Sequence, residues 1–300
     1  MQDSQRSIVV IGNFDGVHSG HRGLIERARE LSDGRPVVAV TFWPHPQAVI
    51  HPGTEPLLLT DLHQRIDLLR DAGADEVRVV TFDHEVMGWS PAEFVERVID
   101  PLHPAVVVVG TNFHFGSRAA GTVETLRELG AGRFDVVATD LVTVGDEGTC
   151  SSAIRKALAD GDVELAAQHL GRPFRYVGVV VMGHQRGRDL GFPTANLPTP
   201  PGFAVPADGV YAGWATRLDQ PGAERWPAAI SVGTNPTFDD VRATVVEAHV
   251  LDRDDLELYG IEIAVDFVAR LRGNVKFESL DALIAQIGAD VAAARSILLG

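Results

Sequence analysis

The pattern of apolar positions divides the chain into two halves with different periods. In the first half, short runs of Val, Ile and Phe alternate with segments whose apolar residues recur every three or four positions. The first kind of segment is typical of strands buried on both faces, and the second is typical of helices that bury one face. The predicted strands are residues 8–11, 36–42, 77–82, 106–109 and 134–138, and the predicted helices are residues 24–31, 62–72, 91–99 and 123–129. Strands alternating with helices indicate an α/β domain, Rossmann-like, with a parallel sheet.

The second half loses the helical spacing after two short predicted helices, residues 152–159 and 163–170. Turns rich in Gly, Pro and Asp then separate further predicted strands, which are residues 176–182, 210–216, 228–232, 244–251 and 261–268. Strands without intervening helices favour an antiparallel β-barrel or sandwich, and an amphipathic helix over residues 280–299 follows them. We therefore expect two domains, residues 1–170 and residues 171–300.

Composition limits the classes of function. The 300 residues fit two domains at roughly 150 residues each. The 41 acidic residues against 26 basic ones give a net charge of −15, which argues against non-specific binding of nucleic acid. A single cysteine, Cys150, excludes an intrachain disulfide and a cysteine zinc cluster, and a cytosolic (cytoplasmic) compartment is the simplest interpretation. No apolar run approaches the length of a membrane span, and the polar start does not resemble a signal peptide.

Candidate chemistry begins directly after the first predicted strand. Residues 12–21 read Gly-Asn-Phe-Asp-Gly-Val-His-Ser-Gly-His. Ligands of open α/β sheets bind beyond the carboxyl ends of the strands, and a helix N-terminus there attracts phosphate. His18 and His21 are spaced to face one side of a helix, where imidazoles can donate hydrogen bonds to phosphate oxygens. From the residues alone, a surface pair or a two-ligand metal site stays an alternative.

This segment resembles the HxGH signature of the nucleotidylyltransferase superfamily. In detail it resembles the start of the bifunctional bacterial riboflavin kinase/FMN adenylyltransferases, also called FAD synthetases. Residues 41–46, 110–116 and 150–155 are similar to that family's TFxPHP, GxNFxFG and SSTxIR motifs. The resemblance implies that AMP is transferred from ATP to the phosphate of FMN, which gives FAD and pyrophosphate.

The same resemblance implies a role for each matching residue. His18 and His21 would hold the ATP phosphates, and Asn112 would meet the nucleotide phosphates or their Mg²⁺. The remaining nucleotide-binding residues that it implies are Gly12, Phe14, Asp15, Gly16, Ser151, Ser152 and Arg155. Without the resemblance, the two serines are more simply explained as helix N-caps.

A second glycine-rich segment, residues 183–196, lies in the predicted barrel. It resembles the riboflavin kinase motif GxxxGRxLGxPTAN, and residues 231–238 resemble SVGTNPTF. The resemblance implies that Thr194 is a ligand of Mg²⁺ and that Asn196 orients the phosphates or the metal. The further binding residues that it implies are Gly187, Arg188, Gly191, Pro193 and Asn235.

Glu247 is the candidate general base of this second segment. It is an acidic residue on an apolar predicted strand, on the opposite face to Val246 and Ala248. A base must reach the primary hydroxyl of riboflavin as that hydroxyl attacks the γ-phosphate of ATP, and the resemblance gives Glu247 this role. Without the motif, an ordinary outward-facing strand residue is the simpler interpretation.

The sequence thus predicts a bifunctional enzyme that phosphorylates riboflavin to FMN and adenylylates FMN to FAD. The expected partners are the small molecules riboflavin, FMN and ATP, with Mg²⁺; self-association is reported for some members of the family. One alternative is a riboflavin kinase with a weakened or altered-nucleotide adenylyltransferase module, because Trp43 and Cys150 depart from the family's pattern beside the nucleotide site. Another alternative is a flavin-binding regulatory protein.

Overall fold

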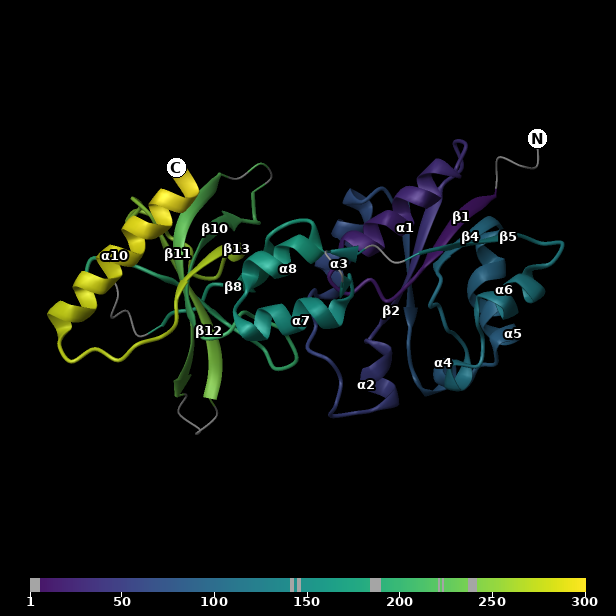
Figure 1. The fold of residues 1–300 in the computed structure, drawn as a ribbon, viewed down its shortest axis with the longest axis horizontal. Coiled ribbons are helices and arrows are strands. Elements are labelled where there is room, and N and C mark those ends of the chain that lie inside the picture. The colour runs from purple at the N-terminus through teal and green to yellow at the C-terminus, as the bar shows by residue number, and fades with distance from the viewer. Residues whose placement is uncertain are drawn as a thin grey trace. The chain divides into compact units, whose positions relative to one another are not determined.

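The computed structural model of the chain describes residues 6–140, 143–144, 147–183, 190–220, 222, 224–236 and 242–300. Its contacts divide the chain into two compact units, Met1–Ser151 and Ser152–Gly300. This division lies before the domain boundary near residue 171 that the sequence led us to expect. Residues 152–170 are therefore grouped with the second unit (Figure 1).

The first unit is built on a parallel sheet of five strands, in the order β3-β2-β1-β4-β5. The strands are β1 (Ser7–Ile11), β2 (Val37–Trp43), β3 (Glu76–Thr81), β4 (Pro104–Gly110) and β5 (Asp135–Thr139). The chain returns from β3 at one edge to β4 beside β1, so the strand order reverses between β1 and β4. Ligand sites of open α/β sheets lie at such a switch point, beyond the carboxyl ends of the two strands.

Helices cover both faces of this sheet, as predicted. They are α1 (Ser19–Glu30), α2 (Pro46–Ile50), α3 (Leu62–Asp71), α4 (His84–Gly88), α5 (Pro91–Phe94), a π-helical turn (Val95–Ile99), two 3₁₀ turns (Asp100–Leu102 and Ser117–Ala119) and α6 (Val123–Gly130). A capping box at Ser90 and Glu93 starts α5. The helices α2 and α4 were not predicted, because five residues are too few to show a helical period. A short pair of strands, β6 (Thr143–Val144) and β7 (Glu147–Gly148), follows β5.

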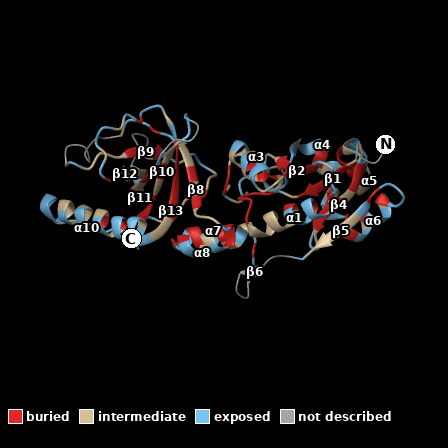
Figure 2. Ribbon diagram, turned by 90° about the horizontal axis from the view of Figure 1, so that it is seen from above, coloured by how far each residue is buried: buried red, intermediate tan, exposed pale blue. Residues whose placement is uncertain are grey.

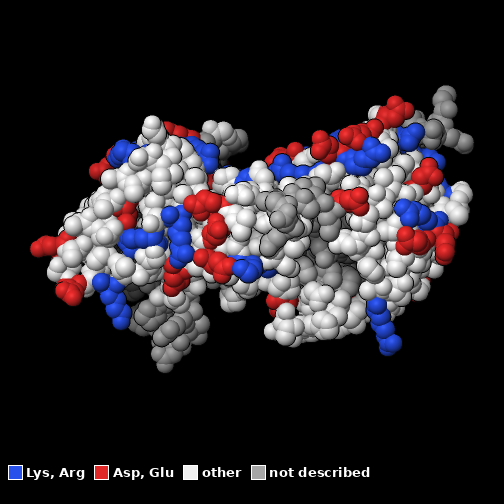
Figure 3. Space-filling model, viewed as in Figure 1, with Lys and Arg blue, Asp and Glu red and all other residues white. Residues whose placement is uncertain are grey.

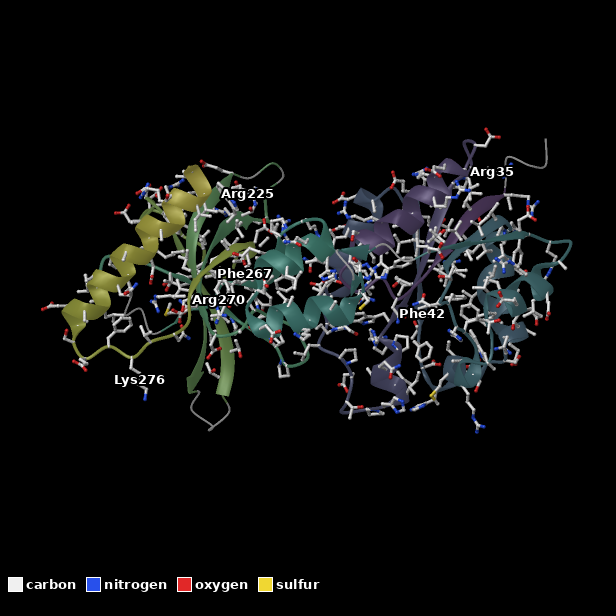
Figure 4. The ribbon with its side chains drawn as sticks, in the orientation of Figure 1. Arg35, Phe42, Arg225, Phe267, Arg270 and Lys276 are labelled. Carbon is white, nitrogen blue, oxygen red and sulfur yellow. The ribbon has the colours of Figure 1, made fainter. Side chains whose placement is uncertain are left out.

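Alternate residues of β1 pack into separate cores on the two faces of the sheet. Ile8 and Val10 join the core under α1 and α3. Val9 and Ile11 join the core under α5 and α6, which also contains Phe42, labelled in Figure 4. The central strands are buried on both faces, and the outer faces of the helices are exposed (Figure 2). This burial explains why the strands appear in the sequence as uninterrupted apolar runs.

The second unit is an antiparallel sheet in the order β8-β13-β10-β11-β12-β9. Its elements are α7 (Ser151–Asp160), α8 (Val163–Leu170), β8 (Phe174–Val179), β9 (Ala195–Pro198), β10 (Gly209–Arg217), β11 (Arg225–Pro236), β12 (Arg242–Val250), β13 (Glu262–Arg272) and α10 (Leu280–Leu299). The N–H of Val181, just beyond β8, donates to the carbonyl of Asn196 in β9 at 2.9 Å. This bridge joins the two edges of the sheet, so the sheet is a nearly closed barrel. The predicted barrel with a terminal helix is confirmed; only β9 was missed among its six strands.

Arg270 of β13 attaches the helices α7 and α8 to the barrel (Figure 4). Its guanidinium donates to the carbonyls of Asp160 at 3.0 Å and Asp208 at 3.2 Å, and its backbone N–H donates to a carboxylate oxygen of Glu164 at 3.3 Å. These contacts give a physical reason for the grouping of residues 152–170 with the barrel.

The terminal helix α10 packs on the barrel through Ala294 and two ion pairs. Asp290 accepts from the guanidinium of Arg272 at 2.7 Å, and Arg295 donates to the carboxylate of Asp252 at 2.6 Å. Of the described helices, α10 is the one long and apolar enough to cross a membrane by length and composition. Its ion pairs with the barrel fit a helix on the domain surface. Acidic and basic side chains are interspersed over the face of the protein that Figure 3 shows.

Candidate active sites

The two histidines of the first loop lie at the start of α1, beyond the carboxyl end of β1. Helix α1 begins at Ser19, earlier than predicted, with His18 as its N-cap. The backbone N–H of His21 donates to Nδ1 of His18 at 3.3 Å, and the two rings stack with their centroids 3.6 Å apart. Because Nδ1 accepts this bond, a neutral His18 carries its proton on Nε2, which is then a hydrogen-bond donor.

His21 is half-buried between apolar and cationic neighbours. Its ring meets Phe14 edge-on at 5.1 Å between centroids. Burial, followed by the charges of His18 and Arg65, holds the pKa of His21 well below its ordinary value of about 6.5. The Nδ1 atom of His21 is buried and makes no hydrogen bond within the described part of the chain. A buried polar atom without a partner is costly, so this nitrogen is a position where a ligand's oxygen would be stabilised.

The other first-loop residues predicted to bind nucleotide form the support of the loop. Phe14 is fully buried in the core, with φ of 52°, and Gly16 has φ of 82°. The Asp15 carboxylate is buried too, and it accepts hydrogen bonds from the backbone N–H groups of Leu59 at 3.1 Å and Thr60 at 3.2 Å. The side chains of Phe14 and Asp15 therefore point into the protein.

Gly12, also predicted to bind nucleotide, donates its N–H to the carbonyl of Val40 at 3.1 Å. A Cβ at Gly12 would come within 3.1 Å of the ring of Phe14. Gly12 thus joins β1 to β2 and leaves room for the buried ring.

Asn112 follows β4, on the other side of the switch point from the histidines. It is exposed, two residues beyond the end of the strand at Gly110. A Cβ at Gly110 would come within 2.9 Å of Oδ1 of Asn112, so the glycine leaves room for this side chain. The topology therefore brings Asn112 to the same edge of the sheet as the loop after β1.

The predicted nucleotide-binding residues Ser151, Ser152 and Arg155 are divided between the two units. The Ser151 hydroxyl donates to the carbonyl of Asp15 at 2.9 Å, which joins it to the first loop. Ser152 and Arg155 lie on α7 in the second unit, and their part in nucleotide binding stays a prediction. Cys150 is an exposed free thiol.

The second site lies on the outer face of the barrel, where β9, β12 and β11 run side by side. Glu247 of β12 pairs directly with Asn196 of β9 on one side and with Ser231 of β11 on the other. Residues directly opposite in antiparallel strands project from the same face. Val246 and Ala248 are buried and Glu247 is half-buried, so the predicted alternation along this strand is confirmed.

Asn196 is held by hydrogen bonds to Thr194. Its amide nitrogen lies 3.2 Å from the carbonyl and 3.4 Å from the hydroxyl of Thr194. A Cβ at Gly183 would come within 2.7 Å of the Asn196 side chain, so this glycine makes room for the amide. Glu247, Asn196 and Thr194 thus form a group of oxygen-bearing side chains.

His249 supports this group, although no role for it was predicted from the sequence. A carbonyl oxygen can only accept, so His249 donates from Nδ1 to the carbonyl of Pro193, 2.8 Å away. Its ring also meets Phe192 edge-on, with centroids 5.5 Å apart. Its place two residues after Glu247, on the same strand face, was the available signal. Both contacts hold the backbone just before Thr194.

The structure describes only some of the remaining residues that were predicted to bind substrate in the second unit. Gly191 has φ of 83°, a left-handed conformation that favours glycine. Gly187 and Arg188 lie outside the described residues, as does the side chain of Asn235, whose backbone belongs to β11.

Comparison with known proteins also divides the chain into two parts, each of which matches a different enzyme family. The family model for FAD synthetase matches residues 1–153, and the model for riboflavin kinase matches residues 170–298. Bifunctional riboflavin kinase/FMN adenylyltransferases from Bacillus subtilis and Escherichia coli are 33% and 36% identical to the chain, over 96% of its length and 92% and 91% of theirs. The one from Pseudomonas fluorescens is 37% identical over 97% of the chain and 92% of its own length.

A solved structure shares the fold of nearly the whole chain. It is a crystal structure described as a macrolide-efflux protein from Streptococcus pneumoniae, with a TM-score of 0.87 and 32% identity, and it covers 97% of this chain and 94% of its own. Matches to both enzyme domains favour two activities over the single-activity and regulatory alternatives. The chain therefore belongs to the family of bifunctional riboflavin kinase/FMN adenylyltransferases.

Proposed function

We propose that the histidine pair and Asn112 form the site of FMN adenylylation, and that Glu247, Asn196 and Thr194 form the site of riboflavin phosphorylation. The observation that carries the first assignment is the buried Nδ1 of His21, which makes no hydrogen bond in the described structure, stacked against His18 at a helix start. The observation that carries the second is the pairing of Glu247 directly opposite Asn196.

In the first reaction, a phosphate oxygen of FMN attacks the α-phosphorus of ATP, and the bond to pyrophosphate breaks. The attacking phosphate is already ionised, so the protein needs to align the reactants and stabilise charge rather than supply a strong base. His18 offers an Nε2–H donor at the N-terminus of α1. Neutral His21 offers a second polar contact through its buried Nδ1, where a hydrogen bond to a ligand is worth more than in water.

In the second reaction, the primary hydroxyl of riboflavin attacks the γ-phosphorus of ATP and ADP leaves. Glu247 accepts the proton of that hydroxyl, which is the task of a general base. Its half-buried position on the barrel's outer face leaves it within reach of a substrate. His249 acts indirectly, by holding the carbonyl of Pro193 and with it the backbone before Thr194.

Mg²⁺ fits the second site by donor chemistry. The hydroxyl oxygen of Thr194 and the amide oxygen of Asn196 are hard ligands, and Mg²⁺ takes few protein ligands when substrate phosphates supply the others. When bound, the ion neutralises charge on the transferring phosphate. Thr194 and Asn196 would hold it, and the hydrogen bonds between them fix their mutual orientation.

The test is a chromatographic time course with the full chain, riboflavin, ATP and Mg²⁺, on the wild type and on two variants. Glu247→Gln should reduce FMN formation by about 10²- to 10⁴-fold while added FMN is still converted to FAD. His21→Ala should keep riboflavin phosphorylation and lose FMN adenylylation, so that FMN accumulates without FAD. A Glu247→Gln variant with full kinase activity, or a His21→Ala variant that forms FAD normally, would refute the assignment of that site.

A further inference from the structure

Arg65 is an unusual residue for its place in the fold. It lies on α3, among core positions of the first unit, and its side chain is completely buried. The apolar spacing of α3 predicts Ile66, Leu68 and Leu69 as core residues and gives no role to an arginine. A buried charge costs free energy unless it is paired, so the groups that the terminal nitrogens of Arg65 contact indicate what it is for.

The terminal nitrogens of Arg65 contact the loop of residues 12–18, which leads to the histidine pair, and two neighbouring segments. One terminal nitrogen donates to the carbonyls of Asn13 at 3.0 Å and Phe42 at 3.3 Å. The other lies 3.3 Å from a carboxylate oxygen of Asp15 and 3.5 Å from the carbonyl of Thr60. A planar guanidinium can serve these acceptors at once, in fixed directions, which a lysine ammonium cannot do.

The loop needs such a support because its backbone is strained. Phe14 has φ of 52° and Val17 has φ of 39°, and neither is glycine. Side chains in the left-handed region cost free energy, and they persist only where the surrounding structure determines them. Asp15 lies between these two residues, and Asn13 directly precedes Phe14. Arg65 thus contacts the loop within the strained segment that leads to His18.

The charge of Arg65 also affects the histidine pair. Its charge, together with burial and His18, lowers the pKa of His21. The groups that surround His21 are His18 in its stack, Phe14 at its edge, and the ion pair of Arg65 with Asp15. Arg65 therefore acts on the loop in two ways, by geometry and by charge.

We propose that Arg65 is a positioning residue for adenylyl transfer: its guanidinium holds the carbonyls and the carboxylate of residues 13–15 so that His18 and His21 meet the nucleotide in the right place. The inference rests on the proposed role of the two histidines. It predicts a defect confined to FAD formation, because the kinase residues lie in the other unit.

The test uses the full chain, whose kinase activity is an internal control. Arg65→Lys keeps the charge and loses the planar set of donors, so we expect kcat for FMN adenylylation to fall about tenfold or more, with riboflavin phosphorylation unchanged. Arg65→Met also loses the charge, so the acidic limb of the pH–rate profile for FAD formation should move to higher pH, while Arg65→Lys keeps the wild-type limb. Arg29→Met is the matched control, since Arg29 forms a surface ion pair with Asp75 and should leave both activities unchanged.

The possible outcomes separate the inference from the proposed function. The inference would be overturned if Arg65→Lys formed FAD at the full rate, or if a folded Arg65→Met kept the acidic limb of the wild type. The assignment of the site would still stand in that case, provided that His21→Ala formed no FAD. Parallel loss of both activities in the Arg65 variants would show a general folding role and would also overturn it. If His21→Ala formed FAD normally, the site assignment itself would fail, and the inference with it.

Discussion

Gly183→Ala tests how the kinase site positions Asn196. Gly183 directly precedes a stretch outside the described residues, and a Cβ there would lie 2.7 Å from the Asn196 side chain. Real Cβ atoms do not approach so closely, so either the backbone or the amide must move. The amide is the far end of a side chain, so we expect it to move and to lose its two hydrogen bonds to Thr194.

The magnitude follows from those two bonds. A hydrogen bond contributes a net ~0.5–1.5 kcal/mol, and the bond at 3.4 Å is at the weak end, so the orientation of Asn196 is worth about 1–2 kcal/mol. If that orientation matters in the transition state, kcat for riboflavin phosphorylation should fall by about 5- to 30-fold. The amide is half-buried and can bond to water after it moves, so the free energy of unfolding should change by less than about 1 kcal/mol.

A double-mutant cycle gives the decisive assay. Asn196→Ala should impair the kinase at least as much as Gly183→Ala, and the double variant should be no worse than Asn196→Ala alone, because both changes remove the same orientation. Gly288→Ala in α10, where a Cβ meets nothing within 4 Å, is the control for adding a methyl group. Additive losses, or a Gly183→Ala variant with wild-type kcat, would refute the reasoning.

Three further predictions concern other parts of the chain. Gly20→Ala would bring a Cβ within 3.2 Å of the His18 ring, so FAD formation measured by chromatography should fall. The midpoint of thermal unfolding should stay the same or rise, because alanine favours the helix. Asp290→Ala would leave the Arg272 guanidinium without its carboxylate, and the free energy of unfolding measured with denaturant should fall by about 2–3 kcal/mol. The folded state disfavours the proton on His21, so the stability of the first unit should fall as pH drops below about 6.5, and His21→Gln should flatten this dependence in thermal unfolding at pH 5–8.

The sequence was sufficient for the elements with a clear period. The strands β2, β1 and β4 of the first unit were predicted because both of their faces are covered, so nearly every position is apolar. The edge strands β3 and β5 are more exposed, and they were predicted from short runs of Val and Ala. The strand β9 (Ala195–Pro198) was missed because four residues carry too little alternation, and its neighbour is a motif full of turn-forming residues. The grouping of residues 152–170 with the barrel is supported by Arg270, whose contacts with Asp160 and Glu164 link distant parts of the sequence.

The sequence motifs predicted the candidate site residues but not the residues that hold them in place. His18, His21 and Glu247 stand out because polar groups interrupt apolar or glycine-rich segments. Arg65 could not be found in this way, because its importance comes from backbone carbonyls that it contacts far along the chain, such as that of Asn13. For His249 the sequence offered only its position on the strand face of Glu247, and the carbonyl of Pro193 that it contacts is equally distant. A carbonyl acceptor leaves no trace in the amino-acid sequence.

Several motif glycines share one physical reason that the sequence alone does not reveal. At Gly20, Gly110 and Gly183, a Cβ would lie 3.2, 2.9 and 2.7 Å from a functional side chain, and none of the three has a positive φ. They are therefore not required for backbone flexibility, and their substitution by alanine strains a side chain rather than the chain itself. Each such glycine stands beside the residue that it makes room for, His18, Asn112 or Asn196. In both sites the absence of a Cβ thus leaves space for a polar side chain in its observed position. Alanine variants at these positions should therefore lower activity with little change in the free energy of unfolding.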